Sequence, residues 1–172
     1  MLIDDFNYTI DIWIKELGRY NFDQLCSKPS ENTWSLGQVY MHLIGETEHF
    51  LGQIKKCVSG NSNADGQMSP NAKMMFKNND FPDELIEGPP TNADTPQPNS
   101  KDGLIRSLIN LKKEFNTVGL LISPNTLEGK TKHPGLNYFN ANEWLQFTEM
   151  HLRHHLRQKK RIDEFLKVIN ID

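Results

Sequence analysis

Residues 140–158 read NANEWLQFTEMHLRHHLRQ, and this stretch decides the fold. Asn140 and Glu143 have the spacing of a capping box, in which each side chain bonds the backbone N–H of the other residue at a helix N-terminus. The helix that they begin is expected to run to about Val168. Steps of three and four along it give a stripe that is typical of a helix packed against partners. The members of this stripe are Trp144, Phe147, His151, His155, Ile162 and Phe165.

Three earlier segments have the same helical periodicity. The first covers about residues 3–20. The second begins after the capping pair Ser35 and Gln38 and is expected to end near Gly60. The third has Ser100 as its N-cap and ends before Pro124. Four such helices predict an all-α protein with a four-helix bundle, in which metal and cofactor sites are built from inward-facing side chains.

The segments between these helices have little periodicity. Residues 59–100 contain six of the nine prolines, so we expect a long irregular crossover between helices two and three, with one short helical turn at residues 72–77. Residues 123–139 are expected to form a loop without strands. A chain of 172 residues is the size of one domain, so residues 1–172 are expected to form a single bundle.

Composition excludes several classes of protein. The formal net charge is 19 − 22 = −3, which argues against binding to nucleic acid by phosphate neutralisation. The basic residues of the run 153–161 are expected to form a solvated helix face, with a phosphate contact as the alternative. Cys26 and Cys57 have no CxxC spacing, and neither an export signal nor a membrane span is recognised, so we expect a cytoplasmic protein with no membrane partner.

The histidines of the last helix have the spacing of a chelating pair. His151 and His155 lie four residues apart, so both rings project from one side of the helix. Leu152 stands where an HExxH protease has its glutamate, so that chemistry is excluded. His42 on the second helix lies within the apolar half and is the candidate third ligand. Three histidines would leave open positions on a metal, as catalytic sites do.

Less specific interpretations remain open for these histidines. A histidine near a core is often only hydrogen-bonded, and histidines near a helix C-terminus complement the helix dipole. His154 could be a fourth ligand, a donor that supports a ligand or a surface residue; we expect that it is not a ligand and count it among the supporting candidates. Other candidates for a supporting role around the metal are His49, which shares the face of His42, and Gln158, one turn after His155.

Two further side chains are candidates for the pocket or for catalysis. Trp144 lies two turns before His151 and could form a wall of a pocket, although packing is the simpler role for it and for Trp34. Glu46 is the carboxylate best placed to act as a general base. P-loop, dinucleotide-binding and serine-hydrolase motifs are absent from the sequence.

Two motifs resemble those of the DinB/YfiT-like family. One is the segment from Trp34 to His42, and the other runs from His133-Pro134 through Glu143-Trp144 to the HxxHHxxQ pattern of residues 151–158. The second motif is similar to a subgroup with an HP loop. The resemblance implies an up-up-down-down bundle, a metal held by His42, His151 and His155, and a homodimer. It also implies thiol-dependent transferase or isomerase activity in some members.

Two classes of function follow. The first is a metal-dependent enzyme with a three-histidine divalent metal site that transfers a low-molecular-weight thiol to a small-molecule substrate or acts as a hydrolase. Imidazole ligands do not distinguish Zn, Ni and Fe. The second class is a non-catalytic metal-binding bundle that serves as an interaction or stress-response module, with residues 59–100 as a partner-binding arm.

Overall fold

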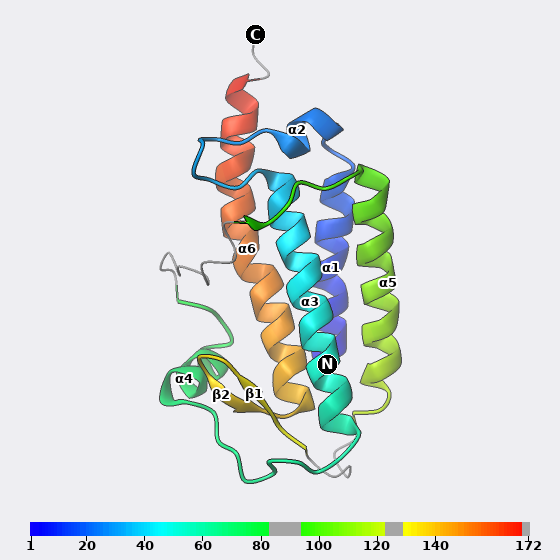
Figure 1. The fold of residues 1–172 in the computed structure, drawn as a ribbon, viewed down its shortest axis with the longest axis vertical. Helices are drawn as coiled ribbons and strands as arrows, with labels where there is room; N and C mark the ends of the chain where they lie inside the picture. Colours follow the sequence, from blue (N-terminus) through cyan, green and yellow to red (C-terminus); the bar gives the residue numbers. More distant parts are fainter. Residues whose placement is uncertain (83–93, 123–128, 170–172) are drawn as a thin grey trace.

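Four long helices lie side by side in the computed structural model (Figure 1), which describes residues 1–82, 94–122 and 129–169. They are α1 (Leu2–Leu17), α3 (Leu36–Val58), α5 (Lys101–Gly119) and α6 (Ala141–Ile169). The all-α four-helix bundle predicted from periodicity is therefore confirmed. Within the described residues, no helix is both long and apolar enough to cross a membrane.

The helix starts are where the capping residues predict them. The Ser35 side chain accepts a hydrogen bond from the backbone N–H of Gln38, and the Gln38 side chain accepts one from the Ser35 N–H. Asn140 and Glu143 form the same reciprocal pair at the start of α6, at 2.7 and 2.8 Å. These two caps fix the starts of the two helices that carry the histidines.

The direction of the helices differs from the up-up-down-down order implied by the resemblance. Residues in the first halves of α1 and α6 contact each other, so these two helices are parallel. Residues near the ends of α3 and α5 contact each other, so these two are also parallel. The first half of α1 contacts the end of α5, so α1 and α5 are antiparallel. The pairs are Thr9–Glu149 (2.9 Å), Lys55–Glu114 (2.7 Å) and Asn7–Asn116 (2.9 Å). The order is therefore up-down-down-up (Figure 1), and α3 lies antiparallel to α6.

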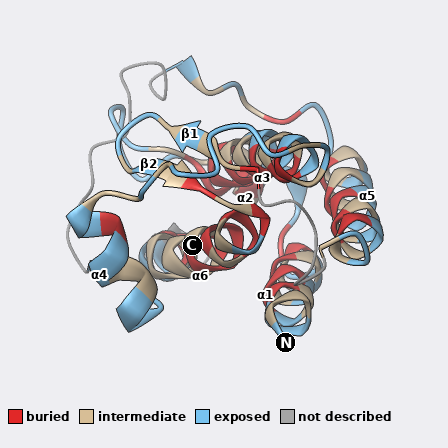
Figure 2. Ribbon diagram, turned by 90° about the horizontal axis from the view of Figure 1, so that it is seen from below, coloured by how far each residue is buried: buried red, intermediate tan, exposed pale blue. Residues whose placement is uncertain are grey.

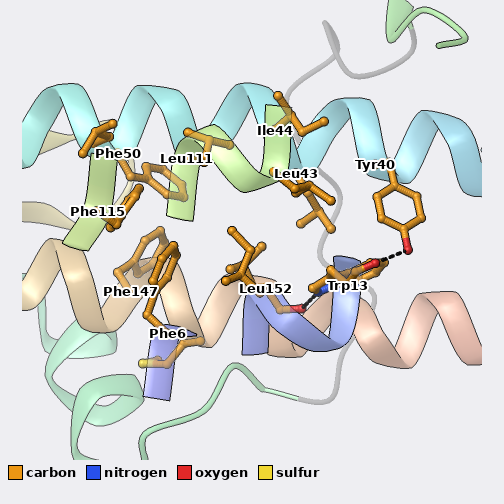
Figure 3. Close-up of a cluster of buried hydrophobic side chains, with 14 of the residues drawn as sticks. Phe6, Trp13, Tyr40, Leu43, Ile44, Phe50, Leu111, Phe115, Phe147 and Leu152 are labelled. Carbon is orange, nitrogen blue, oxygen red and sulfur yellow. Dashed lines mark hydrogen bonds between the residues drawn. The ribbon is translucent and has the colours of Figure 1, made fainter. Parts of the chain in front are cut away.

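The interior of the bundle is apolar and closely interlocked. The buried residues lie mainly on the faces that the four helices turn toward one another (Figure 2). The indole N–H of Trp13 donates to the Leu152 carbonyl at 3.1 Å, and the Tyr40 hydroxyl donates to the Trp13 carbonyl at 2.9 Å (Figure 3). These two bonds satisfy the polar ends of two buried aromatic residues and tie α1 to α3 and α6.

Smaller elements were not all expected. A short helix α2 (Phe22–Cys26) follows α1, and α4 (Pro70–Asn78) includes the short turn predicted at residues 72–77. The expectation of a loop without strands at residues 123–139 is wrong, because β1 (Thr131–His133) and β2 (Asn137–Phe139) form an antiparallel hairpin. This hairpin and α4 lie beside the lower part of α6 (Figure 1).

Candidate metal centre

Three imidazole rings meet between α3 and α6. The candidate ligand nitrogens of His42, His151 and His155 all lie within 4.8 Å of one another. His42 reaches the pair on α6 because the two helices are antiparallel neighbours. Within the described residues no carboxylate or thiolate belongs to this cluster.

The spacing of the ring nitrogens fits a transition-metal ion. The Nε2 atoms of His151 and His155 are 3.2 Å apart. Two nitrogens that are each about 2.05 Å from a tetrahedral ion lie about 3.3 Å apart, so these two atoms could bind one ion with little movement. Three neutral imidazoles are also a donor set that zinc, nickel and iron accept.

Gln158 determines which nitrogen of His155 carries the proton. The Nδ1 atom of His155 lies 2.8 Å from Oε1 of Gln158. An amide oxygen only accepts hydrogen bonds, so Nδ1 must be the donor and Nε2 keeps its lone pair. That lone pair faces the cluster, which is the tautomer that metal binding requires.

In the described part of the chain, His151 has no such hydrogen-bond acceptor to hold its proton on Nδ1. Its Nδ1 atom is buried and has no hydrogen-bond partner among the described residues. A buried nitrogen without a partner costs about 1 to 3 kcal/mol. The tautomer that metal binding requires is therefore fixed by a hydrogen bond at His155 but not at His151.

Burial keeps all three rings neutral. It lowers the pKa of His42 to about 4. It also lowers the pKa of His155 to about 3, with the charge of His42 as a further cause. The pKa of His151 falls well below its usual value because of burial and then the neighbouring histidines. At neutral pH the rings thus have lone pairs available for a metal.

Aromatic side chains surround the cluster. The centroid of the Trp34 ring is 5.0 Å from that of His42. Phe50, Phe81 and Phe147 approach His151 at 5.5, 6.1 and 6.5 Å. Sequence reasoning assigned none of the three phenylalanines to the site, and Phe81 comes from the crossover, where no periodicity indicated a buried residue.

Two arginines of α6 hold the crossover segment that carries Phe81. Arg157 donates to Asp80 at 2.6 Å and to the Phe81 carbonyl at 3.3 Å, and Arg153 donates to the Asn79 carbonyl at 2.6 Å. The ring of Phe81 then also lies 5.2 Å from that of His154. This segment of the crossover is attached to the wall of the site.

The basic run of α6 is not the solvated face that was expected. Arg153 also pairs with Glu149, and Lys159 is buried, with its Nζ atom 2.7 Å from each of Glu16, Asp163 and the Tyr20 hydroxyl. Glu149 and Asp163 lie four residues from their partners on α6, just outside the basic run, and this spacing is a local signal for the pairing. Glu16 is distant in sequence, so no local pattern could indicate it. Only Lys160 and Arg161 of the run are exposed.

The remaining candidates lie at different distances from the cluster. His154 has its ring 5.4 Å from that of His155 but is not one of the three converging residues. Glu46 is one turn beyond His42 and partly exposed. Trp144 is fully buried, with its ring 6.4 Å from His49 and 5.7 Å from His133, and so lies beside a different pair of histidines.

Comparison with known families agrees with this arrangement. A family model described as the DinB superfamily matches residues 9–158, a range that includes all three histidines and Gln158. No curated protein matches the chain.

Proposed function

The chain belongs to the DinB superfamily, and from this membership and the three-histidine cluster we propose that it is a metal-dependent enzyme that acts on a small molecule. The observation that carries the proposal is the convergence of His42, His151 and His155 from two antiparallel helices. Three protein ligands leave at least one position of a divalent ion for water or substrate, which is the pattern of catalytic sites.

The histidines would hold the ion, and the chain around them would control access and orientation. When bound, a divalent ion at such a site lowers the pKa of a coordinated water or thiol, so that a nucleophile is present at neutral pH. Gln158 holds the proton of His155 on Nδ1 and would thereby leave the lone pair of Nε2 available to the ion. Phe50, Phe81 and Phe147 limit water around His151.

The surface of α3 beside His42 leaves room for a substrate. A Cβ atom placed on Gly45 or Gly52 would meet no other atom within 4 Å. Gly45 precedes Glu46, and both lie near the face of α3 that carries His42. We therefore propose that substrate approaches along this strip.

The proposed reaction is transfer of a low-molecular-weight thiol to an electrophile or hydrolysis of a small ester or amide. Both reactions require a nucleophile activated at an open position, and neither requires a second cofactor. The competing function is a non-catalytic bundle with a structural metal. The described part of the crossover, attached to α6 through Arg153 and Arg157, offers no support for a free partner-binding arm.

Elemental analysis of protein purified without a histidine tag tests the proposal. We expect about one divalent ion per chain in the native protein and in the control His154→Gln, and loss of that ion in His42→Ala. Metal-loaded protein should then accelerate thiol addition or ester hydrolysis over the His42→Ala variant. Absence of a bound ion at saturating metal would refute the proposed site, and a bound ion without either activity would favour the non-catalytic function.

A further inference from the structure

A short connection after α4, residues 79–81, lies against the metal centre, and we call it the strap. The ring of Phe81 lies 6.1 Å from that of His151, and only 9% of the residue is exposed. The other two phenylalanines beside His151 belong to the bundle, Phe50 to α3 and Phe147 to α6. Of these three rings, Phe81 is therefore the one that can move away from His151 without unpacking α3 from α6.

The bonds between the strap and α6 are polar and partly exposed. The Asp80 carboxylate pairs with Arg157 at 2.6 Å and with Arg153 at 3.4 Å. The same two arginines donate to the backbone carbonyls of Phe81 and Asn79, at 3.3 and 2.6 Å. The three charged side chains are 32 to 37% exposed, so dissolved salt screens their attraction. The attachment of the strap to α6 should therefore weaken as the ionic strength rises.

The strap begins at a fixed point. Asn79 ends α4 in the left-handed conformation, at φ 50° and ψ 40°, which asparagine adopts more readily than most residues. Its backbone N–H and that of Asp80 each bond a carbonyl of α4 at 3.2 Å, and its side-chain oxygen accepts from Gln146 of α6 at 2.9 Å. Rotation about the Asp80 backbone would lift Phe81 while α4 stays in place, because residues at the ends of elements can absorb such changes.

We propose that the strap is a salt-sensitive latch that controls how fast a divalent ion enters and leaves the three-histidine cluster. This inference rests on the proposed function, because it assigns a means of regulation to the same metal site. In the closed state Phe81 keeps water from His151, and separation of Asp80 from its two arginines would open a path to that ring. The proposed substrate path lies along α3, whereas the strap is bonded to α6, so the latch acts on exchange of the ion.

A latch has a kinetic signature that a structural support lacks. The three histidines are the same in the open and closed states, so opening should raise the association and dissociation rates by one factor and leave the dissociation constant unchanged. A support for the ligands would instead lower the affinity through the dissociation rate. Comparison of both rates with the dissociation constant therefore separates the two roles.

Stopped-flow transfer of zinc to an excess of chelating dye gives the dissociation rate, and zinc uptake by metal-free protein gives the association rate. Asp80→Asn removes a partly exposed charge and no buried group, so the bundle should fold. An exposed ion pair shifts an equilibrium by up to about fivefold, so loss of both pairs should raise both rates roughly 3- to 10-fold. The dissociation constant should stay within about twofold. Glu164→Gln removes the same charge from an exposed position of α6 and should leave both rates within about twofold of the native values.

Salt and the ring itself supply two further comparisons. Raising potassium nitrate from about 0.1 to 1 M shortens the screening length from about 10 to 3 Å. This change should speed dissociation from the native protein and from Glu164→Gln but barely alter it in Asp80→Asn. Phe81→Ala keeps the ion pairs and removes the ring, so its rates should be high at every salt concentration.

Metal-free protein gives a readout that does not depend on zinc. The ring of His154 lies 5.2 Å from that of Phe81, so its carbethoxylation, located by mass spectrometry, should be faster in Asp80→Asn than in Glu164→Gln. Equal modification of His154 in these two variants, or equal zinc exchange rates, would overturn the latch and leave the proposed function intact. A faster dissociation rate with an unchanged association rate would also overturn it. Latch kinetics in a zinc-loaded protein without catalytic activity would support the latch and refute the proposed function, and absence of bound zinc would overturn both.

Discussion

Replacement of Gln158 by methionine should weaken metal binding without unfolding the bundle. The Gln158 side chain makes one bond at the site, the 2.8 Å contact that fixes the tautomer of His155. Methionine has a similar length and is accommodated in helices, but its sulfur is a weak acceptor. The variant therefore removes the support of one ligand and leaves all three ligands in place.

The magnitude follows from the function of such supporting bonds. Loss of the partner of a metal-bound histidine costs about 10- to 100-fold in metal affinity, which is about 1.4 to 2.7 kcal/mol. His155 should show the full effect, because without an acceptor at Nδ1 its proton can move to Nε2 and block the lone pair. Gln158→Glu retains an acceptor oxygen, so its affinity should equal or exceed that of the native protein.

Competition for zinc between the protein and a chelating dye at pH 7.5 measures these affinities. Urea unfolding of the metal-free proteins should give similar midpoints for the native chain and both variants, so that an affinity change reports the site. If folded Gln158→Met binds zinc within twofold of the native protein, the argument that Gln158 prepares His155 is wrong.

Three other expectations concern stability. Lys159→Met removes the cation of Asp163 and one of the two cations of Glu16, which keeps Arg19, and should lower the free energy of unfolding by about 3 kcal/mol. The exposed Lys160→Met should change it by less than about 0.5 kcal/mol; urea unfolding measures both. Gly37→Ala places a Cβ 2.8 Å from the Leu25 carbonyl oxygen and should lower the free energy of unfolding by about 1 to 3 kcal/mol. At Gly45 a Cβ meets no atom within 4 Å, so Gly45→Ala should raise the free energy of unfolding by about 0.5 to 1 kcal/mol. Thermal melting of the two variants measures both effects. Burial lowers the pKa of His42 to about 4 in the folded protein, whereas the pKa of an unfolded histidine is about 6.5. The contribution of neutral His42 to the stability of the metal-free protein should therefore be complete above about pH 6.5. As the pH falls from there toward 4, the unfolded chain binds a proton that the folded protein does not, and the free energy of unfolding should fall by at most about 1.4 kcal/mol per pH unit for this group. Urea midpoints measured from pH 7.5 to 4.5 should therefore fall less steeply for His42→Phe.

The sequence predicts the bundle well because its signals are local. The pairs Ser35–Gln38 and Asn140–Glu143 lie three residues apart, and the structure forms both caps. The apolar stripes likewise depend on neighbours within one helix. The helix directions, by contrast, depend on which connections cross the bundle, and no local pattern records that.

The residues around the metal centre could not be predicted from the sequence, because they come together through contacts between residues far apart in the chain. Phe81 reaches His151 only because Arg157 binds Asp80, a residue 77 positions away in the sequence. The His133 ring was recognised only as part of a loop, because a hairpin with three-residue strands has too short a pattern to detect. His42, His151 and His155 could be selected beforehand, since each lies on a strongly periodic helix.

The order of the helices requires a crossover that runs the length of the bundle, but it does not require one of 42 residues. Because α3 and α5 are parallel, the chain must return along the whole bundle between Val58 and Lys101. The 19 residues of α5 are about 28 Å long, a distance that about nine extended residues can span. The 42 residues from 59 to 100 far exceed this need. Part of the excess builds α4 and the Asp80–Phe81 segment, which Arg153 and Arg157 fix against α6. The crossover thus adds Phe81 to the aromatic rings that α3 and α6 already place around His151.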